Sequence, residues 1–138
     1  MKILLTGATG YIGKRILPVL IQKGYHVICC VRDKKRFNPP ASILKHIDII
    51  EVDLLKTETL KNIPKDIDGA YYLVHSMSSA TNYEVLEKKS AENFRNHIEK
   101  TTINHLVYLS GIVNNSELSK HLESRKNVEN ELSKGKYH

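Results

Sequence analysis

The sequence predicts an α/β protein built on a doubly wound parallel sheet. Short apolar runs of strand length alternate along the chain with longer segments that have helical periodicity. A turn with three glycines joins the first run to the first helical segment, and the second run, Tyr25 to Arg32, is almost wholly apolar, as in strands covered on both faces. Parallel neighbours need long, right-handed connections, so we expect three layers, α/β/α, and the strand order 3-2-1-4-5.

The turn with three glycines is the most informative stretch of the chain. It follows the apolar run Ile3 to Leu5 and reads Thr-Gly-Ala-Thr-Gly-Tyr-Ile-Gly from Thr6 to Gly13. At a strand-to-helix junction the first glycine permits a tight turn, the second lets a ligand approach the backbone, and the third lets helix and strand pack closely. Amide groups at the start of the helix have no partner within it and carry partial positive charge. The turn therefore predicts a binding loop for a phosphate.

The first helix is predicted from Tyr11 to Lys23, with apolar residues at positions 12, 16, 19 and 20. Pro18 removes one backbone hydrogen bond, so we expect a bend there, although the periodicity continues beyond it. Lys23 and Gly24 form a typical helix end, which returns the chain to the start of the second strand.

The later elements are predicted from the same signals, short apolar runs for strands and helical spacing of apolar residues for helices. The segment from Asp33 to His46 is polar and contains two prolines, so we expect a loop with one helical turn at Ser42 to Lys45. A sixth strand would start near Lys136 to His138, so residues 1–138 are expected to form one domain that stops before it. The other predicted strands are Ile47 to Val52, Ala70 to Val74 and His105 to Leu109, and the other helices are Thr57 to Asn62, Thr81 to Lys100 and Ser119 to Leu132.

Composition narrows the class of protein. The chain has 138 residues, enough for one domain, and no run of about 18 apolar residues, so we expect a cytoplasmic protein without a membrane partner. The net charge of +6 suits an anionic ligand, and charge runs of mixed sign argue against nucleic acid. Cys29 and Cys30 lie in a predicted buried strand and are interpreted as packing residues. Scattered histidines without thiolate neighbours predict no metal site.

Four motifs, taken in order, resemble one protein family. They are the glycine turn, Val31-Arg32-Asp33 at the end of the second strand, Val52-Asp53-Leu54 after the third, and Leu106 to Gly111 at the fifth. Together they resemble the extended and atypical short-chain dehydrogenase/reductases, and among these the NmrA-like proteins most. The resemblance implies a Rossmann domain that binds NAD or NADP. Such domains are usually followed by C-terminal substrate-binding elements, for which this chain is too short.

The resemblance also implies a set of cofactor-binding residues. A guanidinium at the position of Arg32 pairs with the 2′-phosphate of NADP, although the neighbouring Asp33 leaves NAD open. Asp53 is implied to contact the adenine, with Leu54 beside the ring, and a cap on the following short helix is an equal alternative for Asp53. The full set is Gly7, Thr9, Gly10, Tyr11, Ile12, Gly13, Arg32, Asp53, Leu54, His75 and Ser76.

His75 and Ser76 correspond to the family's loop under the nicotinamide ribose, with a simple surface turn as the alternative. The proton-donating pair departs from the family's Tyr-x-x-x-Lys. Ser110 matches the family's serine, whereas the last helix carries His121 and Arg125 at the spacing of the pair. These two residues share a helix face, and histidine donates a proton near neutral pH while arginine does not.

Two functions therefore stay open. One is an NADP-dependent oxidoreductase that acts on a small carbonyl substrate, with Ser110, His121 and Arg125 as its catalytic residues. The other is an NAD(P)-binding regulator of the NmrA-like type, which is not an enzyme and which changes protein partners with the redox state of its ligand.

Overall fold

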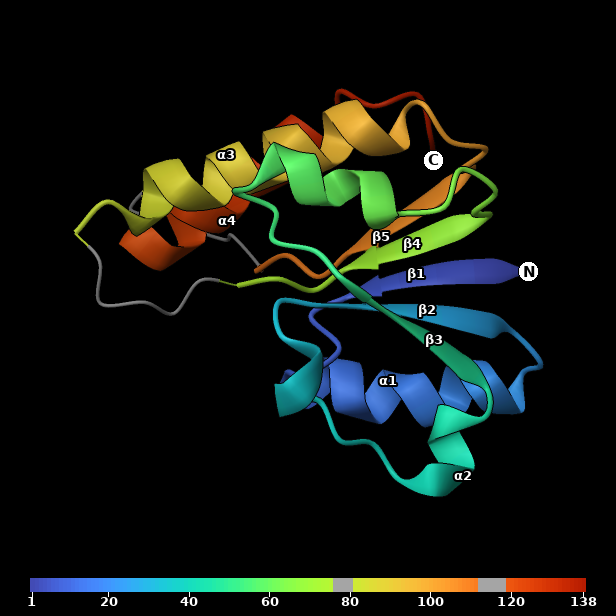
Figure 1. The fold of residues 1–138 in the computed structure, drawn as a ribbon. Helices are drawn as coiled ribbons and strands as arrows, with labels where there is room; N and C mark the ends of the chain where they lie inside the picture. The colour runs from blue at the N-terminus through green and yellow to red at the C-terminus, as the bar shows by residue number, and fades with distance from the viewer. Residues whose placement is uncertain (76–80, 112–118) are drawn as a thin grey trace.

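The computed structural model describes residues 1–75, 81–111 and 119–138. Five parallel strands form a single sheet in the order β3-β2-β1-β4-β5, which confirms the predicted topology (Figure 1). The strands are β1 (Lys2–Thr6), β2 (His26–Val31), β3 (Ile47–Glu51), β4 (Gly69–Tyr72) and β5 (His105–Tyr108).

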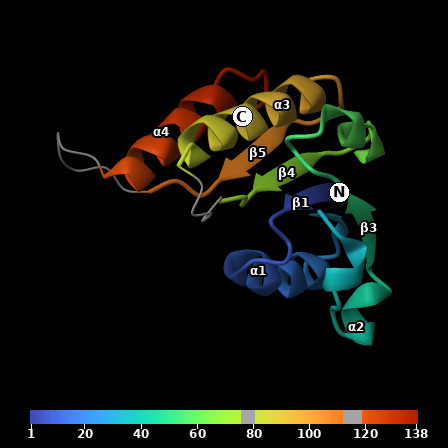
Figure 2. The ribbon, with the colours of Figure 1, turned by 60° about the vertical axis from the view of Figure 1, so that its left-hand side comes forward.

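Helices cover both faces of the sheet. In Figures 1 and 2, α1 and α2 lie on one face, and α3, α4 and η2 lie on the other, so the expected three layers are present. The α-helices are α1 (Tyr11–Gln22), α2 (Ala41–Leu44), α3 (Tyr83–Ile98) and α4 (Lys120–Leu132), and the short 3₁₀ helices are η1 (Lys34–Arg36) and η2 (Thr57–Asn62). None of the helices in the described part of the chain is long and apolar enough to cross a membrane.

The core is divided by the sheet into two apolar clusters. Side chains of successive strand residues point to opposite faces, so Leu5 of β1 packs with the α1 cluster while Leu4 packs with the α3 and α4 cluster. The same alternation separates the two cysteines, since Cys29 joins the first cluster and Cys30 the second. Both thiols are free and buried, as their interpretation as packing residues requires.

The first helix follows its prediction closely. It runs from Tyr11 to Gln22 with Pro18 inside it, Lys23 caps it, and Gly24 follows at φ +80° with its amide bonded to the carbonyl of Ile21. The left-handed backbone at residue 24 is the conformation for which a glycine at a helix end is selected.

Two local predictions were wrong. The strand β4 ends at Tyr72 and not at Val74, because the amide of Leu73 donates to the hydroxyl of Thr6 at 3.2 Å instead of continuing the ladder. The loop after β2 is also more ordered than expected. Asp33 accepts a hydrogen bond from the amide of Lys35 at 2.9 Å and so caps η1.

The end of the chain lies against β5. The amide of His138 donates to the carbonyl of Asn104 at 2.9 Å, and the carbonyl of His138 accepts from the amide of Leu106 at 2.8 Å. This is the bonding pattern of a parallel bridge, with His138 opposite His105. The residues at which a sixth strand was expected to start therefore lie beside β5, at the edge of the sheet.

Candidate functional site

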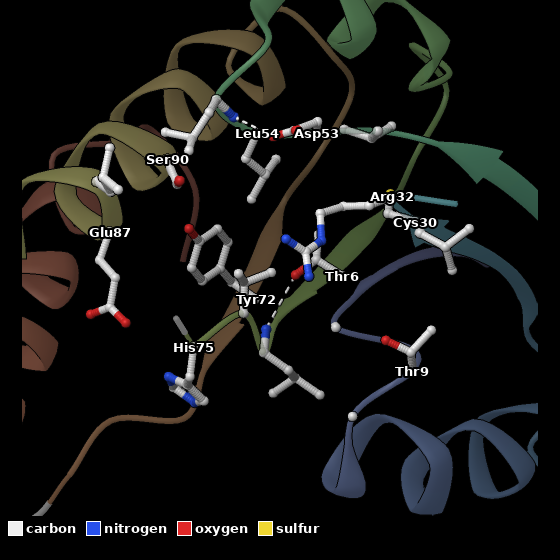
Figure 3. Close-up of a pocket in the computed structure, with 18 of the residues that line it drawn as sticks. Thr6, Thr9, Cys30, Arg32, Asp53, Leu54, Tyr72, His75, Glu87 and Ser90 are labelled. Carbon is white, nitrogen blue, oxygen red and sulfur yellow. Dashed lines mark hydrogen bonds between the residues drawn. The ribbon is translucent and has the colours of Figure 1, made fainter. Parts of the chain in front are cut away.

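A cleft of about 560 Å³ opens at the carboxyl ends of the strands, between the glycine turn and α3 (Figure 3). Parallel strands direct their carboxyl ends to the same edge, so residues distant in sequence meet there. Seven residues of the predicted cofactor set line this cleft: Gly7, Thr9, Gly10, Arg32, Asp53, Leu54 and His75.

The first and third glycines are required by close backbone contacts. Gly7 has φ +71°, and a Cβ atom there would lie 2.6 Å from the carbonyl oxygen of Leu73 on the neighbouring segment. Gly13 packs against the turn itself, where a Cβ atom would lie 2.1 Å from the carbonyl oxygen of Gly7. These are the tight turn and the close helix packing that the spacing predicts.

The second glycine, Gly10, leaves the first amides of α1 without a side-chain cap. Gly10 is the N-cap and offers no side chain to bond the helix amides, and the first turn contains no acidic residue. The amides of Tyr11, Ile12 and Gly13 therefore lie at a helix start whose partial positive charge is not neutralised locally. The side chain of Tyr11 points away to solvent, with the Arg15 guanidinium 3.8 Å from its ring centroid. Neither Tyr11 nor Ile12 lines the cleft, so the groups that they offer a phosphate at the helix start are their backbone amides.

One end of the cleft is lined by Arg32, which follows β2 (Figure 3). The neighbouring Asp33 is not among the lining residues. Its Oδ1 atom is bonded to the amide of Lys35 in η1. Arg32 and Asp33 are the two residues that could contact the ribose of a dinucleotide. Arg32 lines the cleft, whereas Asp33 caps η1.

Asp53 does not cap the helix that follows, because the N-cap of η2 is Lys56 and no side chain bonds to its first amides. The Oδ1 atom of Asp53 accepts from the amide of Leu55 at 3.0 Å, which shapes the turn after β3, and the residue also lines the cleft. The contact of Asp53 with an adenine stays a prediction. Leu54 is buried, and its carbonyl oxygen accepts from the side-chain amide of Asn93 on α3 at 2.8 Å. The wall made by these two residues is thus fixed to α3 by a buried hydrogen bond.

The opposite end of the cleft carries His75, which is partly buried after β4. Burial lowers the pKa of its imidazole, the charge of Arg125 lowers it further, and the charge of Glu87 opposes both. Ser76, the other residue predicted for this loop, lies outside the described residues.

Sequence reasoning missed two polar residues that α3 contributes to the cleft. Glu87 and Ser90 both line it, one helical turn apart. The carboxylate of Glu87 also accepts a hydrogen bond from the hydroxyl of Ser124 on α4. The available signal was a pair of polar residues on the helix face that also carries the core residues Ala91 and Phe94.

None of the three residues predicted to be catalytic lines the cleft. The hydroxyl of Ser110 donates to Glu129 at 2.9 Å. His121 is exposed, and its ring stacks on that of Tyr83 with centroids 5.3 Å apart. The positive charge of Arg125 lowers the pKa of His75, after the larger effect of burial. A catalytic role for these residues stays a prediction.

Comparison with solved structures supports the same fold. A nucleoside-diphosphate-sugar epimerase from Staphylococcus aureus matches 99% of this chain at a TM-score of 0.81 and 18% identity. The NADPH-dependent quinone oxidoreductase QOR2 of Escherichia coli, in complex with NADPH, matches 98% at 0.78 and 14% identity. The triphenylmethane reductase of Citrobacter sp., in complex with NADP(H), matches 96% at 0.75 and 15% identity. This chain covers 48%, 46% and 45% of those chains, respectively, so it spans about half their length.

Sequence comparison identifies the family. The uncharacterised protein YLL056C of Saccharomyces cerevisiae is 34% identical over 73 residues, which are 53% of this chain and 24% of that protein. A family model described as NAD(P)H-binding matches residues 7–137, from the first glycine of the turn to the end of α4 and beyond. The glycine turn, the strand order and this match agree, and the chain belongs to the NAD(P)H-binding family.

Proposed function

We propose that the chain is the dinucleotide-binding domain of an NADP-dependent oxidoreductase of the atypical short-chain dehydrogenase/reductase class. The observation that carries the preference for NADP is the separation of Arg32 from Asp33. A 2′-phosphate requires a cation, for which Arg32 lines the cleft, whereas a 2′-hydroxyl is read by a carboxylate, and that of Asp33 does not line the cleft and accepts the amide of Lys35 at Oδ1. Two relatives of the same fold are in complex with NADPH or NADP(H), which supports the same preference.

The rest of the cleft fits such a ligand. The glycine turn leaves no room for a side chain at Gly7 and offers helix amides for a pyrophosphate. Asp53 and Leu54 form a wall suited to an adenine, which stacks on apolar surface and donates from its amino group. A bound nicotinamide would supply the hydride, and the residues of this cleft would bind and orient the dinucleotide.

The preference for NADP is tested by charge reversal at Arg32. We expect Arg32→Glu to weaken NADP⁺ binding by about 10- to 100-fold, as for a lost charged hydrogen bond, and to change NAD⁺ binding by less than about 3-fold. Isothermal titration calorimetry measures both affinities. Arg36→Glu is the matched control, because Arg36 is exposed in η1 and does not line the cleft. Equal losses for the two dinucleotides would contradict the assignment.

The alternative is an NAD(P)-binding regulator without catalysis. Two observations favour it: Ser110 is bonded to Glu129, and His121 is stacked on Tyr83, so neither replaces the missing tyrosine at the cleft. Oxidation of NADPH, followed at 340 nm with a panel of aldehydes, ketones and quinones, separates the two functions. Turnover that is lost in Ser110→Ala or His121→Ala supports the predicted catalytic residues. Tight NADPH binding without turnover on any carbonyl supports the regulator.

A further inference from the structure

The cleft contains a histidine that the family's pattern does not assign to proton transfer. His75 is partly buried and lines the cleft at the end of β4 (Figure 3). His121, which holds the expected position on α4, is exposed and stacked on Tyr83. Of these two histidines, only His75 lines the cleft.

In the described part of the chain, β5, α3 and α4 each contribute a polar or charged neighbour to His75. From β5, the ring of Tyr108 lies 6.3 Å from the imidazole, centroid to centroid. From α3, Glu87 contributes a negative charge, and from α4, Arg125 contributes a positive one. Burial first, and then the charge of Arg125, lower the pKa of the imidazole, and the charge of Glu87 opposes them.

These neighbours are held in place by hydrogen bonds between elements. The hydroxyl of Ser124 donates to the carboxylate of Glu87 and joins α4 to α3 beside the cleft. The hydroxyl of Tyr108 donates to the carbonyl oxygen of Arg125 at 3.3 Å. The Arg125 side chain lies over the chain after β5, where a Cβ atom on Gly111 would be 3.6 Å from both its Cδ and Nη1 atoms. These hydrogen bonds tie α3, α4 and β5 together beside His75.

We propose that His75 is the proton-transfer residue of this site and that Arg125 on α4 supports it in this role, an inference that rests on the proposed function as an NADP-dependent reductase. In the reduction of a carbonyl, a hydride from the reduced nicotinamide ring forms the new C–H bond, and the π-electron pair of the C=O bond moves to oxygen. The imidazolium of His75 gives its proton to that oxygen, which yields an alcohol and the oxidised dinucleotide. Solvent then returns a proton to the imidazole.

Proton NMR of the histidine rings tests the placement without depending on turnover. The ring signal of His75 is identified by its loss in His75→Asn, and its pH titration is followed with and without saturating NADP⁺. We expect a pKa below the ordinary value of about 6.5, a change in the signal when NADP⁺ binds, and a higher pKa in Arg125→Gln but not in the control Arg15→Gln.

The possible failures are distinguishable. If NADP⁺ shifts the amides of the glycine turn but leaves the His75 ring signal and its titration unchanged, the inference is overturned and the proposed cofactor function stands. If NADP⁺ binds nowhere in the cleft, both are overturned. An unchanged His75 pKa in Arg125→Gln would remove the role given to Arg125.

Kinetics then test proton transfer itself. With NADPH and menadione or benzaldehyde as probe substrates, we expect kcat/KM of the full chain to fall as the pH rises through the pKa of His75. His75→Asn should lower kcat by at least about 100-fold and remove this pH dependence, with KM for NADPH changed little. His97→Asn is the control, because its imidazole on α3 also has a pKa lowered by burial but does not line the cleft. Turnover that requires His121 and not His75, or turnover of neither probe, would overturn the proposal.

Discussion

The backbone of Gly13 lies so close to the carbonyl oxygen of Gly7 that a Cβ atom at residue 13 would be 2.1 Å from that oxygen. It would also be 2.9 Å from the Cα atom of Ala8. The start of α1 can therefore rest on the turn only if residue 13 has no side chain. The position of the helix amides at the cleft depends on this contact.

We predict that Gly13→Ala destabilises the fold by about 3 kcal/mol, because backbone atoms must move to accept the added carbon. Gly24→Ala is the control. A Cβ atom there meets nothing within 4 Å, so the only cost is the left-handed backbone at φ +80°, about 1 kcal/mol. Urea denaturation of the two variants measures the difference. Equal losses of unfolding free energy would show that the close contact does not constrain the turn.

A second prediction concerns the wall of the cleft. Asn93 and Asn62 each donate from the side-chain amide to a backbone carbonyl at 2.8 Å, but the bond of Asn93 to Leu54 is buried and that of Asn62 to Glu51 is exposed. Asn93→Ala leaves a buried carbonyl without its donor, so we expect a loss of about 2 kcal/mol, against less than about 0.5 kcal/mol for Asn62→Ala.

Because Leu54 lines the cleft, Asn93→Ala should also weaken NADP⁺ binding, whereas Asn62→Ala should not. Thermal denaturation and calorimetric titration of both variants check the two effects. An Asn93→Ala protein with unchanged stability and unchanged affinity would contradict the anchoring role of this hydrogen bond.

The third prediction concerns the contact between α3 and α4. Glu131 is almost fully buried, and it accepts hydrogen bonds from Lys134 at 2.8 Å and from Arg95 at 2.9 Å. These bonds, that of Lys134 first, lower the pKa of the Glu131 carboxyl group. A carboxyl group whose pKa is lower in the folded state stabilises the fold above its unfolded pKa of about 4.3, and the contribution is lost as the pH falls through the folded pKa.

We therefore expect Glu131→Gln to reduce the free energy of unfolding by about 2 kcal/mol at pH 7, and the deficit to shrink at acid pH. Denaturation curves between pH 7 and pH 3 measure it. Glu92→Gln is the control, since Glu92 pairs with Lys89 on the exposed side of α3 and should show little effect at either pH. A deficit that is independent of pH would contradict the ionic role of Glu131.

The topology and one half of the cleft could be predicted because their signals are local. A strand followed by Gly7, Gly10 and Gly13 indicates a turn whose close backbone contacts exclude side chains. A residue just after a buried parallel strand lies at the carboxyl edge of the sheet, as Arg32 does. The same reasoning overlooked that Asp33 caps η1. The local cue was an aspartate two residues before the amide that it binds.

The other half of the cleft depends on how α3 packs against α4, which periodicity does not specify. Glu87 and Ser124 meet only because the two helices lie side by side, and the same packing brings the charge of Arg125 close to His75. The spacing of His121 and Arg125 indicated a shared helix face, but it did not indicate that the ring of Tyr83 would stack on the exposed ring of His121. Contacts between helices distant in sequence therefore set the charges that act on His75.

The central claim, that the glycine turn and Arg32 hold NADP, is tested most directly by amide NMR during titration with NADP⁺. We predict concentration-dependent shifts for the amides of residues 9–13 and Arg32, with Gly24 unchanged. Gly10→Ala should abolish these shifts while the protein stays folded, because its Cβ atom would meet only the Gly7 carbonyl oxygen, at 3.3 Å, and would occupy the ligand's approach. Amides in the turn that stay unmoved at saturating NADP⁺ would contradict the account.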